Sequence, residues 1–240
     1  MRITGFRWES EMIAVLRSHF ASVAAVVEEL DVRHGRVDLC VYECEEQRAP
    51  ISAPALRLYS KLHRRFVHLS ELTLTLLASV RVLQQYAREL EHHQLIDRRA
   101  SLVRRRRAYR YPIRKIIAVE AKLADWQRAC EQVLLHRGFA EELWIALDFK
   151  HVARVNIEQV KKHNIGVVAT DRDGLFIMHP AVATPFSRSF ALERAMVHES
   201  LLARQTSGDH DVSCMRAATL ASSSAFDPLR LQAFASHALT

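Results

Sequence analysis

The residues best suited to chemistry lie at the end of an apolar stretch, Ile116-Ile117-Ala118-Val119-Glu120-Ala121-Lys122. Its β-branched and small apolar residues, with no Gly or Pro, predict a buried strand. Because side chains alternate between the two faces of a strand, Glu120 and Lys122 point the same way. A buried carboxylate and a buried ammonium are costly unless they are paired or used in a reaction. The stretch therefore indicates a functional site.

An acidic residue followed two positions later by Lys is a weak signal, since about one match is expected from composition in a chain of this length. A second match, Asp148-Phe149-Lys150, follows another apolar stretch. This rival pair ends its strand, precedes no amphipathic helix and has no carboxylate one hairpin upstream. We therefore place the site at Glu120 and Lys122 and keep Asp148 and Lys150 as the alternative.

The elements that would position the site are predicted from hydrophobic periodicity. Residues 8–20 have helical spacing, and Glu11 lies in the first turn, where the helix dipole favours acids. Residues 23–32 and 36–42 predict two strands joined by a turn that contains Gly35. Asp38 is a lone carboxylate inside the second strand, for which a charge at an edge or a hairpin end is the alternative explanation.

Downstream of the Glu120 strand, Asp125 caps a helix that is expected to run to about Arg137 and to end at Gly138 as a C-cap. Gln132 lies beside the apolar stripe of this helix. The remaining expected elements are strands at 142–147, 166–170 and 175–178, and helices at 156–163 and about 190–204. The Ser- and Ala-rich segment that follows has no predicted function.

Charge is concentrated in the middle of the chain. Residues 51–115 contain 15 Lys and Arg against 4 Asp and Glu, a net charge of +11, whereas the other 19 basic and 23 acidic residues leave the rest at −4. Such a basic block predicts a polyanion as partner, with DNA the leading candidate and RNA left open. The absence of a long apolar run or a signal peptide, and the four cysteines, predict a cytoplasmic protein with no membrane partner.

The basic segment itself predicts three helices, which begin near Pro54, Ser70 and Ser79, and then a hairpin over 95–111 whose tip carries four arginines. Across residues 54–112 this order resembles a winged helix-turn-helix module. The resemblance implies that the third helix enters the major groove and that the hairpin contacts the DNA backbone. The residues implied to bind nucleic acid are Ser79, Arg81, Gln84, Gln85, Arg88, Arg104, Arg105, Arg106 and Arg107. A solvated basic helix pair that packs on the rest of the chain is the alternative.

The whole order of elements resembles the PD-(D/E)XK nuclease superfamily over residues 8–50 and 114–178. The residues that carry the resemblance are Asp38, then Val119-Glu120-Ala121-Lys122-Leu123, and then Gln132. It implies an α/β fold, with a restriction-endonuclease-like α-β-β-β-α-β core in which helices flank a mixed sheet, and with an inserted, mainly α winged-helix domain. The expected domains are a discontinuous core at 1–50 and 114–185, the insert at 51–113, and a C-terminal helix and tail at 186–240. The chain departs from the family pattern in lacking a Pro before Asp38 and in the 82 positions between Asp38 and Glu120, which the insert explains.

This resemblance implies hydrolysis of DNA phosphodiester bonds with Mg²⁺ or Mn²⁺ as cofactor. Asp38, Glu120 and the Ala121 carbonyl would hold the metal ion. Lys122 would orient the attacking water or stabilise charge on the phosphorane. Gln132 would donate a positioning hydrogen bond, and Glu11 would hold a second metal ion or a metal-bound water.

Two other functions stay open. One is a non-catalytic DNA-binding regulator that keeps a nuclease scaffold, and the other is an RNA-directed nuclease or a defence or toxin effector. The intact set of Asp38, Glu120 and Lys122 favours a nuclease over a regulator, since buried charges without a use are costly. A homodimer is also left open, because nucleases with one site per chain often pair.

Overall fold

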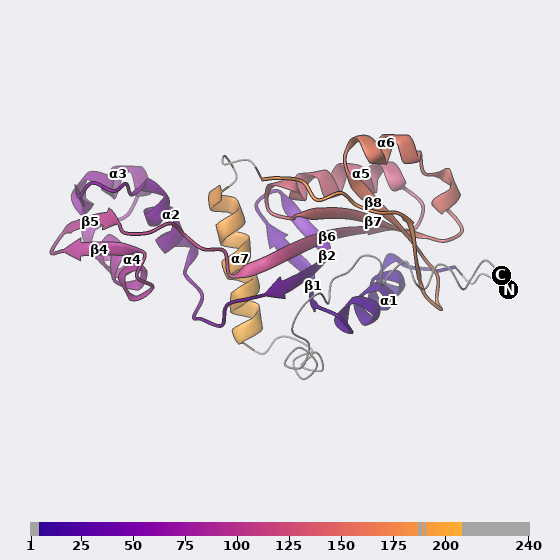
Figure 1. Cartoon of the computed structure of the whole chain (residues 1–240), viewed down its shortest axis with the longest axis horizontal. Coiled ribbons are helices and arrows are strands. Elements are labelled where there is room, and N and C mark those ends of the chain that lie inside the picture. The colour runs from indigo at the N-terminus through magenta and orange to yellow at the C-terminus, as the bar shows by residue number, and fades with distance from the viewer. Residues whose placement is uncertain (1–4, 187–188, 190, 208–240) are drawn as a thin grey trace.

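The computed structural model describes residues 5–186, 189 and 191–207, which form an elongated molecule around one mixed sheet (Figure 1). The sheet has six strands in the order β1-β2-β6-β7-β8-β9. β6, β7 and β8 are parallel to one another, and the other neighbours are antiparallel. The bounds are β1 (Ala25–Val32), β2 (Gly35–Cys44), β6 (Ile113–Lys122), β7 (Glu142–Asp148), β8 (Ile165–Thr170) and β9 (Leu175–His179).

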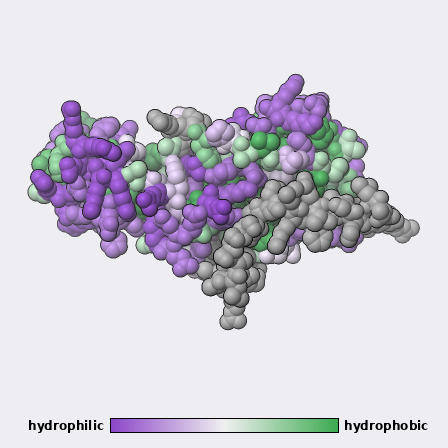
Figure 2. All heavy atoms as spheres, viewed as in Figure 1, coloured by the Kyte–Doolittle hydropathy of each residue, from purple (hydrophilic) through white to green (hydrophobic). Residues whose placement is uncertain are grey.

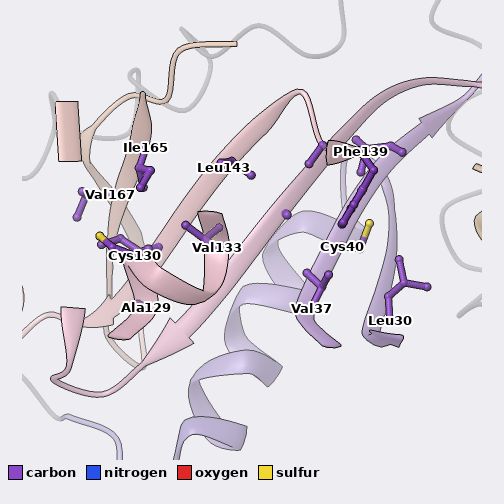
Figure 3. Close-up of a cluster of buried hydrophobic side chains, with 14 of the residues drawn as sticks. Leu30, Val37, Cys40, Ala129, Cys130, Val133, Phe139, Leu143, Ile165 and Val167 are labelled. Carbon is purple, nitrogen blue, oxygen red and sulfur yellow. The ribbon is translucent and has the colours of Figure 1, made fainter. Parts of the chain in front are cut away.

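Helices cover both faces of this sheet, as the α/β prediction requires. On one face, α1 (Glu9–Ala21) buries Met12 and Leu16 against Val119 and its neighbours. On the other face, α5 (Trp126–Leu134) buries Ala129 and Val133 against Ala118 and the outer strands, and Figure 3 shows this cluster. The shorter elements on that second face are η2 (Leu135–Gly138), η3 (Val152–Arg154) and α6 (Ile157–Lys162).

Between β2 and β6 the chain forms a separate basic lobe, the insert, which lies at one end of the molecule (Figure 1). The insert has its own three-stranded sheet, in the order β3-β5-β4, and its own apolar core around Leu56, Leu83 and Val103. Its elements are α2 (Ala53–Lys61), β3 (Val67–His68), η1 (Leu69–Leu72), α3 (Thr73–Leu76), α4 (Val80–His92), β4 (Ile96–Arg99) and β5 (Leu102–Arg105).

The helix starts expected in the insert follow from side-chain caps. The hydroxyl of Ser79 accepts a hydrogen bond from the Val82 N–H at the start of α4, as predicted, and Ser52 caps α2 in the same way. The apolar spacing after Pro54 predicts a helix to about Phe66, but α2 ends at Lys61 and leaves Phe66 outside it. The turn between α3 and α4 passes through Leu77, which has a left-handed backbone conformation with φ of 50°.

Two further predictions of local structure were wrong. The four arginines do not lie at the tip of the hairpin, because Arg104 and Arg105 are part of β5 and the turn is made by Ala100 and Ser101. Ala100 takes the left-handed φ of 53° that this tight turn requires, although it is not the Gly or Asn that usually marks such a turn. Gly138 is not a left-handed C-cap, because the chain continues from α5 into η2 without a positive φ at Gly138.

The C-terminal helix α7 (Ala191–Thr206) joins the two lobes. Val197 and Leu201 belong to the core under the large sheet, whereas Ala195 belongs to the core of the insert. The predicted C-terminal helix thus packs on both lobes, and the remainder of the predicted tail lies outside the described residues. None of the helices in the described part of the chain has the length and apolarity needed to span a bilayer.

One carboxylate of α7 holds both chain segments that connect the lobes. Glu199, which is buried, accepts hydrogen bonds from the Arg48 guanidinium at 3.0 and 2.5 Å and from the Ile51 N–H at 2.8 Å, on the segment that enters the insert. It also accepts one from the Tyr109 hydroxyl at 2.5 Å, on the segment that returns. Burial and this carboxylate together raise the pKa of Tyr109, so the phenol stays protonated and keeps donating.

We expect Glu199→Ala to lower the free energy of unfolding by roughly 3–5 kcal/mol, because it removes the buried partner of Arg48 and leaves the Ile51 N–H and the Tyr109 hydroxyl without an acceptor. Urea denaturation followed by circular dichroism measures this change. The control is Glu158→Ala, which removes an exposed carboxylate of α6 that pairs with Lys161 and should leave the midpoint almost unchanged. Equal midpoints for the two variants would contradict the role given to Glu199.

Candidate functional site

The centre of the candidate site is the pairing of β2 with β6. Leu39 lies opposite Val119 and Cys40 opposite Ala118, so the antiparallel register sets Asp38 opposite Glu120. Both carboxylates lie on the sheet face that α5 covers, because Cys40 and Ala118, two residues away in each strand, belong to the cluster on that face. The two acidic residues predicted from the sequence are therefore brought together.

Glu120 is the more deeply buried of the two carboxylates, with a relative exposure of 1%. Its Oε1 lies 2.8 Å from Nε2 of His136, which is equally buried. Burial raises the pKa of Glu120, the hydrogen bond to His136 opposes that rise, and the nearby Asp38 carboxylate adds to it. A carboxylate in this condition is strongly stabilised by any cation that comes close to it.

Lys122 is the last residue of β6 and lies next to Asp38. Its Nζ donates to the Ala121 carbonyl at 2.9 Å and lies 3.4 Å from Asp38 Oδ2. The same Asp38 oxygen accepts the Ala121 N–H at 2.9 Å, which fixes the carboxylate against the strand. Only 12% of the Lys122 side chain is exposed, so its ammonium is held among oxygen atoms at the end of β6.

The acid that α1 contributes is not the predicted one. Glu9 Oε2 lies 3.3 Å from Lys122 Nζ, at the first turn of the helix. Glu11 instead accepts the Arg7 N–H at 3.0 Å and pairs with Arg172 at 3.4 Å. Both acids occupy the first helical turn, so the rotation of α1 on the sheet decides which one reaches the site.

The segment formed by α5 and η2 contributes Gln132 and His136, which are four positions apart. Gln132 is half-buried, and its Oε1 is buried without a hydrogen-bond partner in the described part of the chain. The Nδ1 of His136 is also buried without a hydrogen-bond partner among the described residues. The sequence pattern predicted no role for His136. Its position four residues after Gln132, which is the spacing of one helix face, could have indicated one.

The alternative pair, Asp148 and Lys150, has a structural role. Asp148 Oδ2 accepts the Phe6 N–H at 2.7 Å, and Oδ1 accepts the Lys150 N–H at 2.9 Å. Asp148 also lies on the opposite face of the sheet from Glu120, since Ala146 belongs to the cluster beneath α1. Asp148 therefore holds the segment before α1 rather than joining Asp38 and Glu120.

The residues predicted to bind nucleic acid divide into two groups. On α4, Arg81, Gln85 and Arg88 are exposed at a spacing of three and four residues, and the two arginines have no ion pair within the described residues. Gln84 is half-buried, and the Ser79 hydroxyl is used as the helix cap. The surface over the insert is mostly hydrophilic in the view of Figure 2.

The arginines that follow β4 are largely used inside the insert. Arg104 pairs with Asp97 at 2.8 Å, and Arg106 lies 3.9 Å from the same carboxylate. Arg105 lies over the Tyr59 ring and donates to the Tyr59 carbonyl at 3.2 Å, and Arg107 donates to the His93 carbonyl at 2.8 Å. The exposed stripe of α4 is thus better placed than this run to contact a polyanion.

Comparisons with known proteins add little. No family model matches the chain, and no curated protein matches it. A solved structure of a protein of unknown function from Silicibacter pomeroyi is 12% identical, with a TM-score of 0.40, and the match covers 92% of this chain and 98% of that one. A likeness of that strength carries no argument about function.

We expect Glu120 and His136 to be energetically coupled, because each would otherwise leave a buried polar group unpaired. A double-mutant cycle with Glu120→Gln and His136→Gln, followed by urea denaturation, should give a coupling free energy above about 1 kcal/mol. The matched control is the cycle of Lys122→Met with Glu9→Gln, a pair open to solvent on its Glu9 side, for which we expect less than about 1 kcal/mol. Additive effects at Glu120 and His136 would show that the contact contributes nothing to stability.

Proposed function

We propose that this chain is a metal-dependent endonuclease of the PD-(D/E)XK type that hydrolyses phosphodiester bonds in DNA. The observation that carries the proposal is the constellation at the paired ends of β2 and β6, where Asp38 faces Glu120 and Lys122 Nζ lies 3.4 Å from Asp38. The order and directions of the strands around it agree with the core that the resemblance implies.

The donor atoms of the site fit a hard divalent cation. Asp38, Glu120 and the Ala121 carbonyl offer oxygen atoms only, which is the ligand type that Mg²⁺ prefers. No group of three or more His, Cys, Asp or Glu suited to a metal ion occurs among the residues that the structure describes. Mg²⁺ commonly takes one or two carboxylates and completes its shell with water and substrate phosphate, and Asp38 and Glu120 would be those two carboxylates. When bound, the ion would polarise the phosphate and acidify a water molecule.

The side chains of the site have separate roles in this proposal. The Lys122 ammonium would donate to the attacking water or to a non-bridging phosphate oxygen on which charge develops. Glu9 would hold that ammonium in place through its contact at 3.3 Å. Gln132 would donate a hydrogen bond to the scissile phosphate, and His136 would orient Glu120 as an outer partner of a metal ligand.

The insert would bring the polymer to this site. Its helices, the turn before α4 and the β4–β5 hairpin follow the order of a winged helix-turn-helix, in which α4 would lie in the major groove. All four acids of the insert are engaged locally: Glu71 with His68, Glu89 with Ser52, Glu91 with Arg98, and Asp97 with Arg104. The basic excess is therefore left for an external polyanion.

A non-catalytic DNA-binding regulator is the second candidate. The observation in its favour is that Lys122 pairs with both Asp38 and Glu9, which stabilises the site without any metal ion. The two candidates share DNA binding and differ only in cleavage, so an activity assay separates them.

We expect the purified protein to nick or cut DNA with Mg²⁺ or Mn²⁺ and to lose this activity in EDTA. The assay compares supercoiled, linear, branched and single-stranded DNA, with RNA as a further substrate. Lys122→Ala should lower the rate at least about 100-fold, because it removes a donor to the developing charge. Lys150→Ala, which changes the rival lysine, is the control and should keep full activity. If Asp38→Asn and Lys122→Ala proteins cut as fast as the unchanged protein, the site is wrongly assigned.

We expect Arg81→Ala combined with Arg88→Ala to weaken DNA binding and to flatten its dependence on salt by about 1.8 in the slope of log K against log salt concentration. The physical reason is the loss of two phosphate contacts, each of which releases counterions on binding. Titrations at several NaCl concentrations measure this slope. Arg33→Ala combined with Arg36→Ala, in the turn between β1 and β2, is the control with equal loss of charge, and an equal change of slope in both variants would remove α4 from the interface.

A further inference from the structure

A polar cavity lies where the insert joins the rest of the molecule. Its volume is about 280 Å³, and it is bounded by the segment that enters the insert, the end of α4 and the segment that returns. Sites for drug-sized ligands span about 300–1,000 Å³, so this cavity suits a smaller molecule. It is separate from Asp38 and Glu120, which are not among its lining residues.

The lining of this cavity carries an excess of positive charge. It contains three guanidinium groups, from Arg48, Arg107 and Arg110, against the single carboxylate of Glu46. Arg48 pairs with two carboxylates, Glu199 at 2.5 Å and Glu46 at 3.3 Å. Arg107 and Arg110 have no carboxylate partner among the described residues, because Arg107 donates to a carbonyl and Arg110 has no ion pair there. These three guanidinium groups and two carboxylates together carry a net charge of +1, and Arg107 and Arg110 are left to bind an anion.

The end of α4 adds hydrogen-bonding groups to the same cavity. His92 and His93 are among its lining residues, with their ring centroids 5.5 Å apart. Burial, followed by the nearby Arg48, lowers the pKa of His93, so this ring is neutral and has one N–H to donate at neutral pH. The C-terminal end of a helix disfavours an anion, but Arg107 covers the His93 carbonyl and offsets that effect.

We propose that this cavity binds a phosphate monoester, such as a nucleoside monophosphate or the terminal phosphate of a DNA strand. A phosphate monoester offers three terminal oxygen atoms to hydrogen-bond donors, whereas a phosphodiester within a DNA strand offers two non-bridging ones. Guanidinium groups bind phosphate oxygen atoms through paired hydrogen bonds, so Arg107 and Arg110 together suit the larger set of acceptors.

Such a ligand would fasten the two lobes to each other. Arg48 lies on the entering segment and Arg110 on the returning one, and His93 ends the helix that carries the exposed basic stripe. A phosphate that contacts Arg110 and His93, beside the paired Arg48, would fix the orientation of α4 relative to the two connecting segments. This site does not depend on the nuclease centre, and its ligand would regulate how the insert presents a bound polymer.

The test is calorimetric titration of the full chain carrying Lys122→Ala, which prevents cleavage from altering the titrant. The probes are adenosine monophosphate, inorganic phosphate, and a short DNA strand with either a 5′-phosphate or a 5′-hydroxyl. The variants are Arg110→Gln and Arg107→Gln, and the control is Arg57→Gln, an exposed arginine of α2 outside the cavity. Arg110 makes no internal hydrogen bond among the described residues, so Arg110→Gln tests binding without disturbing the fold.

We expect one saturable site for a phosphate monoester, weakened at least tenfold by Arg110→Gln and by Arg107→Gln and unchanged within about twofold by Arg57→Gln. Binding of adenosine monophosphate with this pattern identifies a free nucleotide as ligand, and binding only of the 5′-phosphorylated strand identifies a DNA end. Equal weakening by Arg57→Gln, or equal affinity for the 5′-phosphate and 5′-hydroxyl strands without nucleotide binding, would overturn the proposal. Because cleavage is measured separately on the unchanged protein, failure of the nuclease proposal leaves this result intact.

Discussion

The placement of the two lobes depends on one buried carboxylate. Glu199 receives donors from the entering segment, through Arg48 and Ile51, and from the returning segment, through Tyr109. A buried carboxylate is tolerated only when such donors are all present, so the two segments and α7 must be in position together. The insert is therefore attached to the large sheet through a polar clamp, which consists of Glu199 and its donors Arg48, Ile51 and Tyr109. The cores on either side of α7 are apolar.

Glu120 in the candidate site is also a buried carboxylate, but it has fewer hydrogen-bond donors than Glu199. Burial raises the pKa of Glu120, the hydrogen bond to His136 opposes that rise, and the like charge of Asp38 adds to it. The hydrogen-bonding capacity of Glu199 is satisfied within the protein, whereas in the proposed function the pair of Asp38 and Glu120 would gain further stabilisation from an external cation. That difference is the physical distinction between a structural carboxylate and a candidate ligand in this chain.

Much of this arrangement could be predicted because it is local in sequence. The alternation in β2 and β6 indicated which faces Asp38 and Glu120 occupy, and Ser79 marked the start of α4. The contact of Glu9 with Lys122 could not be predicted, since the rotation of α1 on the sheet distinguishes it from Glu11. His136 lies four positions after Gln132 on the same helix face, but its pairing with Glu120 joins two different elements and gave no local pattern. The hairpin tip was misplaced because Ala100 gives no sign in sequence of its left-handed conformation. The clamp at Glu199 joins residues about 150 positions apart, beyond the reach of any local pattern.

The insertion between β2 and β6 has a consequence for the order of folding. Cys44 pairs with Ile113, so this antiparallel ladder cannot form until the chain between them closes a long loop. Apart from Ala195 of α7, the buried residues in the core of the insert lie within positions 51–103, and local contacts form faster than distant ones. Its early folding would bring the ends of β2 and β6 together and shorten the effective loop. During synthesis α7 emerges after both lobes, so the clamp that orients them closes last.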